Sequence, residues 1–331
     1  MKHWVSLVVA TKDRPDDLRR MMGSLQNQTM PPMEIVVVDA SSNSVEAILK
    51  EFPALSLRYL RHLPPSAAAQ RNAGIHDCSA SATLIGFADD DVIFEPKAFE
   101  LMMRFWDAAP PETLGAAFNL LNYPQRGPSL LKNSRFSESL GLYSPRPGSV
   151  SRSGWQTVIP GLSETQYVDW LPTTAVTFRK EAFQLSLFDA FYESYSYLED
   201  LDLSYTISRR GRLAVVAEAG YLHFPSPSGR VTSFQFGRYE VRNRLHFVRK
   251  HNLSLVRCYL GIAIRLAMSI GNGIVRLDGS QLKRGLGNMI ELLSRMGRSR
   301  SDNESQSSNR QTSTLQTHAY QTSDRLPPKE L

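Results

Sequence analysis

The chain has 331 residues, a formal net charge of +6 and 42% hydrophobic residues, which is enough apolar content for one large or two ordinary domains. Its two cysteines, Cys78 and Cys258, lie far apart and outside any Cys/His cluster. This usage argues against a disulfide scaffold or a zinc site and fits a reducing compartment. The first apolar run is too short for a secretory signal, so we expect a cytoplasmic protein.

The positive charge is concentrated in one C-terminal block. From Arg238 to Arg300 the local charge is +10, whereas the 237 residues before this block carry −3 and the tail from Ser301 carries −1. Because most of the chain is mildly acidic, we expect no nucleic-acid partner.

The first hundred residues alternate between apolar runs of strand length and segments with helical spacing. Strands are expected at 5–10, 34–40, 55–60 and 82–88, and helices at 14–28, 44–52, 66–78 and 97–106. Strands that are apolar throughout and separated by helices predict an α/β protein, with a Rossmann-like, mostly parallel sheet flanked by helices.

The middle of the chain begins with a long segment rich in proline, glycine and serine, 123–166, which we interpret as a functional loop. A strand followed by a helix is expected within 166–184, and a further helix is expected to end at Gly211. A last strand is predicted at 212–219 and a basic helix at 233–251.

The segment 253–277 has helical spacing and is mostly apolar, with one narrow stripe of small or polar residues that includes Arg257, Arg265 and Arg276. Two arginines inside the segment argue against a membrane-spanning helix. The stripe fits a helix in the membrane interface and equally a helix packed on its own domain. From Gly297 onward the composition predicts disorder.

Three consecutive aspartates, Asp89, Asp90 and Asp91, follow the fourth predicted strand. In an extended segment the first and third face one side and the second faces away. Two carboxylates aimed at one point suit Mg²⁺ or Mn²⁺, whereas the alternative is a solvated loop that caps the next helix. Asp13 and Asp39 follow the first two strands at the same predicted sheet edge, where ligands of such sheets bind, and this favours the metal.

Several ordered segments resemble the family 2 glycosyltransferases of the GT-A fold: "VSLVVATKDRPDDLRRMMGSL", "EIVVVDASS", "AAAQRNAGI", "IGFADDDV" and "YLEDLDLSYTISRRG". The resemblance covers about residues 4 to 251 and is greatest for bacterial members that add rhamnose or galactose. It implies a GT-A domain at 1–251, made of a nucleotide-sugar-binding half (1–122), the long loop (123–166) and an acceptor and catalytic half (167–251). A basic amphipathic helical extension (252–296) and a disordered tail (297–331) follow.

The resemblance also implies roles for individual residues. Asp89 and Asp91 match the ends of the DxD motif and would hold Mn²⁺ or Mg²⁺ with His223, and Asp200 matches the general base. The nucleotide sugar would be bound by Thr11, Asp13, Asp39, Arg71, Asp89 and Asp90, and the acceptor by Glu199 and Trp170. Taken alone, Asp200 would be interpreted as a helix cap and His223 as a structural histidine, whereas Trp170 is equally typical of a core residue.

The implied reaction moves a sugar from a nucleotide-diphosphate donor to a carbohydrate or lipid-linked acceptor, by metal-assisted single displacement with inversion. The implied setting is polysaccharide or cell-envelope glycan synthesis, with peripheral membrane contact through 253–300 at the inner face of the membrane. The alternatives are a catalytically silent nucleotide-sugar-binding or scaffold protein and a sugar nucleotidyltransferase. The latter normally has a glycine-rich loop after its first strand, where this chain has "ATKDRPDD".

Overall fold

The computed structural model describes residues 3–123, 135–193, 196–226 and 231–295. The chain divides into two compact units: Met1–Thr232 with Asn243–Arg265, and Ser233–Arg242 with Leu266–Leu331. The divisions near the C-terminus fall inside two long helices, α8 (Ser233–Lys250) and α9 (Leu255–Val275). The predicted boundaries at 251 and 296 stay predictions, and the tail predicted to be disordered lies outside the described residues.

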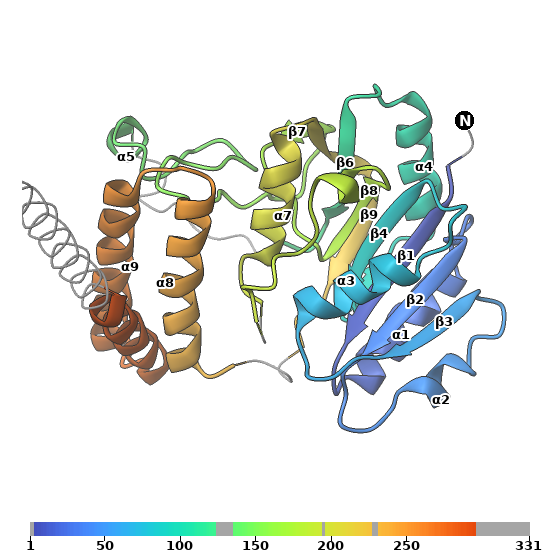
Figure 1. The fold of residues 1–331 in the computed structure, drawn as a ribbon, viewed down its shortest axis with the longest axis horizontal. Helices are drawn as coiled ribbons and strands as arrows, with labels where there is room; N and C mark the ends of the chain where they lie inside the picture. The colour runs from blue at the N-terminus through green and yellow to red at the C-terminus, as the bar shows by residue number, and fades with distance from the viewer. Residues whose placement is uncertain (1–2, 124–134, 194–195, 227–230, 296–331) are drawn as a thin grey trace, which may run out of the picture. The chain divides into compact units, whose positions relative to one another are not determined.

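A central mixed sheet forms the first unit (Figure 1). Its strands are β1 (Val5–Thr11), β2 (Glu34–Asp39), β3 (Leu57–Arg61), β4 (Leu84–Asp89), β5 (Val92–Phe94), β6 (Thr113–Leu120), β7 (Gln166–Val168), β8 (Ala175–Arg179) and β9 (Arg212–His223). They lie in the order β3-β2-β1-β4-β8-β6-β9-β5, and β7 pairs with β9.

The predicted α/β class is confirmed, with one difference in the sheet. β3, β2, β1 and β4 are parallel, as the sequence indicates. Beyond β4 the sheet is mixed, because β8 runs antiparallel between β4 and β6, and β5 and β7 run antiparallel to β9. β1, β2, β4, β6 and β9 therefore all point the same way, and their carboxyl ends share one edge.

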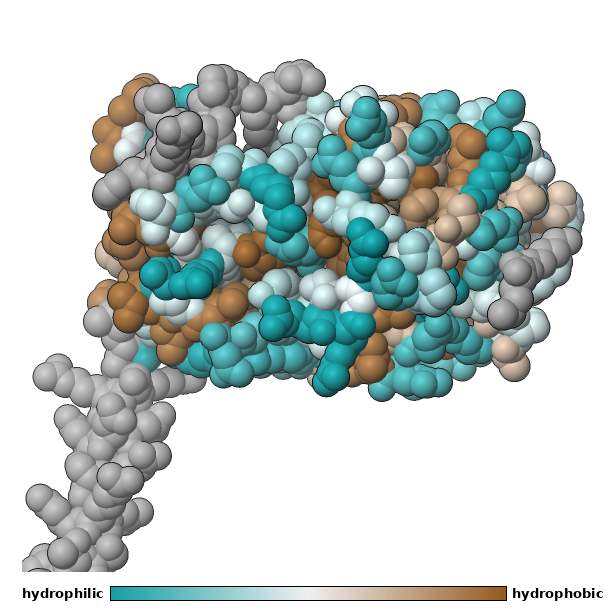
Figure 2. Space-filling model, turned by 90° about the horizontal axis from the view of Figure 1, so that it is seen from above, coloured by the Kyte–Doolittle hydropathy of each residue, from teal (hydrophilic) through white to brown (hydrophobic). Residues whose placement is uncertain are grey.

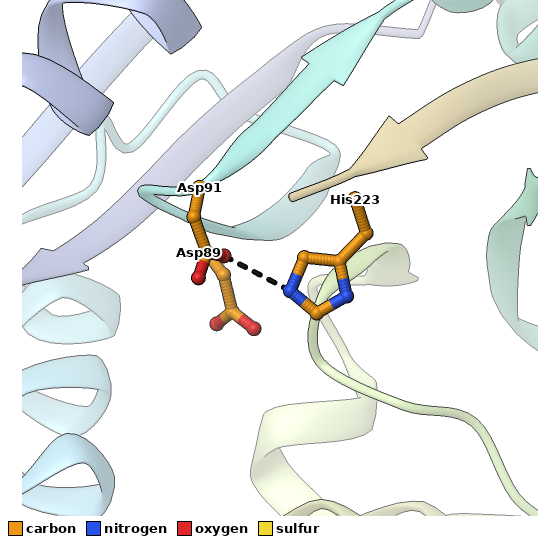
Figure 3. A group of neighbouring side chains, drawn as sticks. All are labelled: Asp89, Asp91 and His223. Carbon is orange, nitrogen blue, oxygen red and sulfur yellow. Dashed lines mark hydrogen bonds and ion pairs between the residues drawn. The ribbon is translucent and has the colours of Figure 1, made fainter. Parts of the chain in front are cut away.

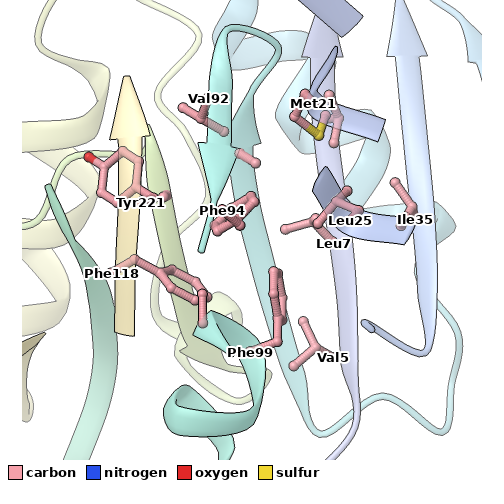
Figure 4. Close-up of a cluster of buried hydrophobic side chains, with 14 of the residues drawn as sticks. Val5, Leu7, Met21, Leu25, Ile35, Val92, Phe94, Phe99, Phe118 and Tyr221 are labelled. Atoms are coloured by element: carbon pink, nitrogen blue, oxygen red, sulfur yellow. The ribbon is translucent and has the colours of Figure 1, made fainter. Parts of the chain in front are cut away.

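Helices cover both faces of the sheet. They are α1 (Pro15–Gln26), α2 (Glu46–Leu49), α3 (Ala67–Asp77), α4 (Ala98–Ala108), α6 (Ala182–Leu185) and α7 (Glu199–Ser208), whereas the short helix α5 (Arg135–Ser139) lies apart from the sheet (Figure 1). Side chains alternate along β1, so Leu7 and Val9 pack with α1 and α4 in one buried cluster (Figure 4). Val8 belongs to the second cluster, on the other face, together with Leu203 and Ile207 of α7. This packing fixes the helix that carries the predicted base against the sheet.

In the second unit the first part of α8 packs against a helical segment at 279–295. Side chains at Gly237 and Gly287 would collide with the carbonyl oxygens of Arg284 and Phe234, so glycine permits this close approach of the two backbones. Arg284 also donates two hydrogen bonds to Glu240, at 3.0 and 2.7 Å. By length and composition alone, α9 could cross a membrane, and it is the one helix of the described chain that could.

Candidate functional site

A triad of potential metal ligands lies at the carboxyl edge of the sheet. Asp89 ends β4, Asp91 directly precedes β5, and His223 ends β9. Val92 pairs with His223 across β5 and β9, which brings the imidazole beside Asp91. One ligand atom from each of the three residues lies within 4.8 Å of the others, and His223 Nε2 is 3.0 Å from Asp91 Oδ1 (Figure 3). The predicted convergence of Asp89, Asp91 and His223 is therefore present.

Asp91 is held in its charged form. Burial by itself would raise the pKa of Asp91, but the contact with His223 and a hydrogen bond from the Ser226 backbone N–H outweigh burial, so this pKa lies below its ordinary value. A carboxylate that stays ionised is a suitable ligand for a hard cation.

Asp90 lies outside the triad, in the turn between β4 and β5 that it forms with Asp91. Its carboxylate accepts hydrogen bonds from Thr11 Oγ1 at 2.8 Å and from Arg14 at 2.9 Å. Burial raises the pKa of Asp90 to about 7, although Arg14 opposes the shift. Arg14 also donates a hydrogen bond to Asp91 at 3.4 Å. Arg14 was not predicted as a site residue from the sequence, although it directly follows Asp13. The nucleotide contacts predicted for Thr11 and Asp90 stay predictions.

Arg71 links the triad to the predicted base region. Its guanidinium donates to Glu199 at 2.6 Å and to Asp89 at 2.9 Å, and the side chain is almost completely buried. The Nε atom of Arg71 is buried and has no hydrogen-bond partner among the described residues. The predicted contact of Arg71 with ribose or diphosphate stays a prediction, since both terminal nitrogens already have protein partners.

Glu199 and Asp200 occupy the first turn of α7. Leu198, at a positive φ of 77°, is the N-cap residue, so Asp200 lies inside the helix and does not cap it. Asp200 Oδ1 accepts a hydrogen bond from the Leu201 N–H at 2.7 Å. Burial nevertheless raises the pKa of Asp200 to about 6, and burial together with the neighbouring Asp200 charge raises the pKa of Glu199.

Negative charge exceeds positive charge in this region. Asp89, Asp90, Asp91, Glu199 and Asp200 contribute five carboxyl groups, against the two guanidinium groups of Arg14 and Arg71. Such an excess is relieved either by protons or by a bound cation. Two carboxylates and an imidazole form a donor set that suits Mn²⁺ and, through its oxygens, Mg²⁺, so the residues present fit a divalent metal ion.

Asp39 organises the loop after β2. It is buried and accepts hydrogen bonds from the backbone N–H groups of Ser41 and Val45, from Tyr59 Oη at 2.8 Å and from Arg61 at 2.7 Å. Burial would raise the pKa of Asp39, but these hydrogen bonds lower it overall. Sequence reasoning missed Tyr59 and Arg61, although Arg61 pairs with Asp39 in the parallel register of β2 and β3.

Asp13 lies in the neighbouring loop, after β1. It is exposed and adopts a positive φ of 53°. Its carboxylate accepts a hydrogen bond from the Ser42 N–H at 2.7 Å, so Asp13 ties the loop after β1 to the loop after β2. The nucleotide contacts predicted for Asp13 and Asp39 stay predictions.

Trp170 borders a small cavity of about 120 Å³ that His223 also lines. The indole is buried, and its Nε1–H donates to the Thr157 carbonyl oxygen at 3.0 Å, so it serves the core as well. The rest of the lining is largely apolar and includes Tyr123, Pro172 and Tyr221. The acceptor roles of Trp170 and Glu199 stay predictions.

The fold and the carboxylate-rich sheet edge define a GT-A type protein, and comparison with known proteins agrees. Residues 6–151 match the family described as Glycosyl transferase family 2. The match covers less than half of the chain and shows that this part is similar to the family 2 glycosyltransferases.

Two proteins of Bacillus subtilis (strain 168) named as glycosyltransferases are similar to it. YwdF is 30% identical over 101 residues, which are 30% of this chain and 37% of YwdF. EpsH is 34% identical over 103 residues, which are 30% of this chain and 29% of EpsH. The chain therefore matches only about a third of the length of either relative.

Among solved structures, the crystal structure of GalNAc-T7 with UDP, GalNAc and Mn²⁺ superposes with a TM-score of 0.53 at 16% identity. The superposition covers 80% of this chain and 57% of GalNAc-T7. At this identity the likeness shows the fold alone.

Proposed function

We propose that this chain transfers a sugar from a nucleotide-diphosphate donor to a carbohydrate or lipid-linked acceptor, in a single displacement with inversion at the anomeric carbon. Its similarity to the family 2 glycosyltransferases and the likeness to glycosyltransferases in the fold support the class of reaction. The observation that carries the proposal is the connection, through Arg71, of the Asp89–Asp91–His223 triad to the carboxyl groups that begin α7.

In this mechanism Asp200 is the general base. With a pKa of about 6 it is ionised at neutral pH yet basic enough to accept the proton of an acceptor hydroxyl as the new bond forms. Glu199 and Arg71 hold the base region beside Asp89. Asp89, Asp91 and His223 would bind Mn²⁺ or Mg²⁺, which supplies positive charge to the departing diphosphate. One base opposite the leaving group is consistent with inversion.

Binding and turnover can be tested separately on a panel of nucleotide sugars. A ligand at 100 times its Kd stabilises the folded state by about 2.7 kcal/mol, so the correct donor should raise Tm by several degrees only when Mn²⁺ is present. Asp91→Asn should abolish this metal-dependent shift. Asp200→Asn should keep the shift and lose turnover by a factor of about 10² or more.

Asp107→Asn is a suitable control, because Asp107 is an exposed carboxylate on α4, outside the site. Donor binding with unchanged turnover in Asp200→Asn would remove the base assignment. Donor binding without any turnover in the unmodified chain, across a broad acceptor panel, would favour the silent binding protein instead.

The acceptor is proposed to approach past Trp170 and His223. The cavity there, at about 120 Å³, is smaller than a typical small-molecule site of about 300 to 1,000 Å³, so it suits an apolar substituent better than a whole sugar ring. This is consistent with a 6-deoxysugar or a lipid-linked acceptor, in polysaccharide or cell-envelope glycan synthesis.

We further propose a cytoplasmic protein that contacts the inner face of the membrane through its C-terminal helices. Apolar side chains of the second unit are exposed, and Figure 2 shows such side chains in brown. This C-terminal apolar surface consists of Ile270, Ile274, Val275, Leu277, Leu282, Leu286, Met289, Ile290 and Leu293. The last five follow helical spacing along 279–295, and the surrounding sequence block carries +10, which suits an anionic lipid surface.

A further inference from the structure

A second cavity lies at the opposite end of α7 and β9 from the predicted catalytic residues. It has a volume of about 330 Å³ and is lined by Arg146, Tyr167, Asp169, Ser208, Arg209 and Arg212, among others, which we call the arginine cavity. Arg212 is the first residue of β9 and His223 is the last. Eleven residues of strand span about 30 Å or more, so the arginine cavity is separate from the metal triad.

Three arginines, Arg146, Arg209 and Arg212, line this cavity together with one carboxylate, that of Asp169. Asp169 accepts hydrogen bonds from Arg146 at 2.6 Å and from the Val150 N–H at 3.2 Å. Its carboxylate is therefore already paired with groups of the loop. Arg212 is 3.8 Å from Glu112, in a pair whose side chains are both about half exposed and which contributes little. Among the described residues no carboxylate pairs with Arg209. The cavity therefore has an excess of positive charge.

The arrangement also orients its donors. The guanidinium carbon of Arg212 lies 3.4 Å from the centre of the Tyr167 ring, a cation–π contact that holds the guanidinium against the ring. A guanidinium held in this way can form paired hydrogen bonds to the oxygens of a carboxylate or phosphate. Tyr167 is itself 38% exposed and presents an aromatic surface of the kind on which sugar rings pack.

We propose that the arginine cavity binds an acidic sugar, that is, a saccharide unit carrying a carboxylate or phosphate group. The cavity volume of about 330 Å³ lies at the lower end of the range for small-molecule sites and matches a ligand of one or two sugar rings. A single oxyanion would fill only a small part of this volume. Binding here is independent of the proposed transfer reaction, because none of these residues belongs to the metal triad or the base region.

The test is calorimetric titration of the full chain at low ionic strength with four probes: glucuronate, glucose 1-phosphate, inorganic phosphate and glucose. The two acidic sugars should bind, phosphate should bind more weakly, and glucose should not bind. Arg209→Ala and Arg212→Ala should each weaken binding of the acidic sugars about tenfold or more, and Arg209→Lys should retain part of it. Asp91→Asn should leave it unchanged, because the triad lies elsewhere.

Arg104→Ala is the matched control, because it removes the same charge from an exposed site on α4. An equal loss in Arg104→Ala would mean that only net charge matters and would overturn the site. Phosphate binding as tightly as glucose 1-phosphate would overturn the assignment to a sugar. Absence of binding by all four probes, or loss of binding in Asp91→Asn, would overturn the proposal altogether.

Discussion

Asp200 is the residue whose surroundings most directly suggest chemistry. Its pKa of about 6 means that the proposed base becomes protonated as the pH falls through this value. We expect kcat/KM of the unmodified chain to fall about tenfold per pH unit below about pH 6 and to level off above it. A pH-rate profile measures this directly, and a profile that stays flat down to pH 5 would rule Asp200 out as the base.

The same shift predicts the effect of Asp200 on stability. Because its native pKa lies above the ordinary 3.8, the folded chain binds more protons than the unfolded chain between about pH 4 and pH 6. The contribution of Asp200 to the free energy of unfolding is therefore greatest below this range and is lost as the pH rises through it. Asp200→Asn should stabilise the chain at pH 7.5 by on the order of 1 kcal/mol and should change little at pH 4. Urea unfolding at the two pH values tests this, and a loss of stability at pH 7.5 would contradict it.

The sequence predicts side-chain direction in the site better than it predicts side-chain partners. Asp89 and Asp91 converge while Asp90 lies outside the triad and bonds to Thr11, as alternation predicts, although Asp90 and Asp91 form a turn. Arg14 and Arg61 were missed because their contacts depend on which strands become neighbours in the sheet. Neighbouring strands here are often far apart in the sequence, so spacing gives no signal for such contacts.

At the scale of the element, α7 is held in place by a cluster of charged residues. Asp202 is fully buried two residues after Asp200, and it accepts hydrogen bonds from Lys250 Nζ at 2.6 Å and from His251 Nε2 at 2.8 Å. Lys250 also bonds to Asp189 at 2.8 Å. The end of α8 is thereby joined to the helix that carries the predicted base.

Removing this buried carboxylate should therefore destabilise the chain. Asp202→Asn leaves His251 without its charged partner and Lys250 with Asp189 alone, and we expect a loss of about 2 kcal/mol in the free energy of unfolding. The same substitution two residues earlier, Asp200→Asn, should have the opposite effect at pH 7.5. Urea unfolding of both variants measures the two changes in the free energy of unfolding. Changes of the same sign would contradict the different environments assigned to the two aspartates.

Most helices and strands were predicted from their local patterns, including α8 and the start of β9, and β5 and β6 are the exceptions among the strands. α1, α3, α4 and the parallel strands β1, β2 and β4 match their predicted places within a few residues. β5 and β6 were not predicted, because three residues are too few for a pattern and "TLGAAFNL" has neither clear alternation nor large apolar side chains. The antiparallel insertion of β8 between β4 and β6 likewise depends on tertiary pairing.

At the scale of the whole molecule, charge and hydrophobicity are divided along the chain. The predicted catalytic groups lie in the first 237 residues, which carry −3, whereas the C-terminal block carries +10 and includes the C-terminal apolar surface. Exposed apolar side chains at helical spacing are unfavourable in water unless another apolar phase covers them. An anionic bilayer would satisfy both the charge and the apolar surface.

Membrane binding is expected to depend on this surface. Ile274, Leu277 and Leu293 are 62%, 91% and 61% exposed, and burial of one such side chain in lipid stabilises binding by about 1.5 to 3 kcal/mol. Replacing each by serine should weaken binding to phosphatidylglycerol vesicles about tenfold or more in co-sedimentation. Leu185→Ser, at an exposed leucine of the first unit, is the control.

Peripheral contact further predicts weaker binding to phosphatidylcholine vesicles, release at high salt and extraction from membranes by alkaline carbonate. Retention in the membrane after carbonate treatment would instead mean that α9 crosses the bilayer, against the expectation from Arg257 and Arg265 within it.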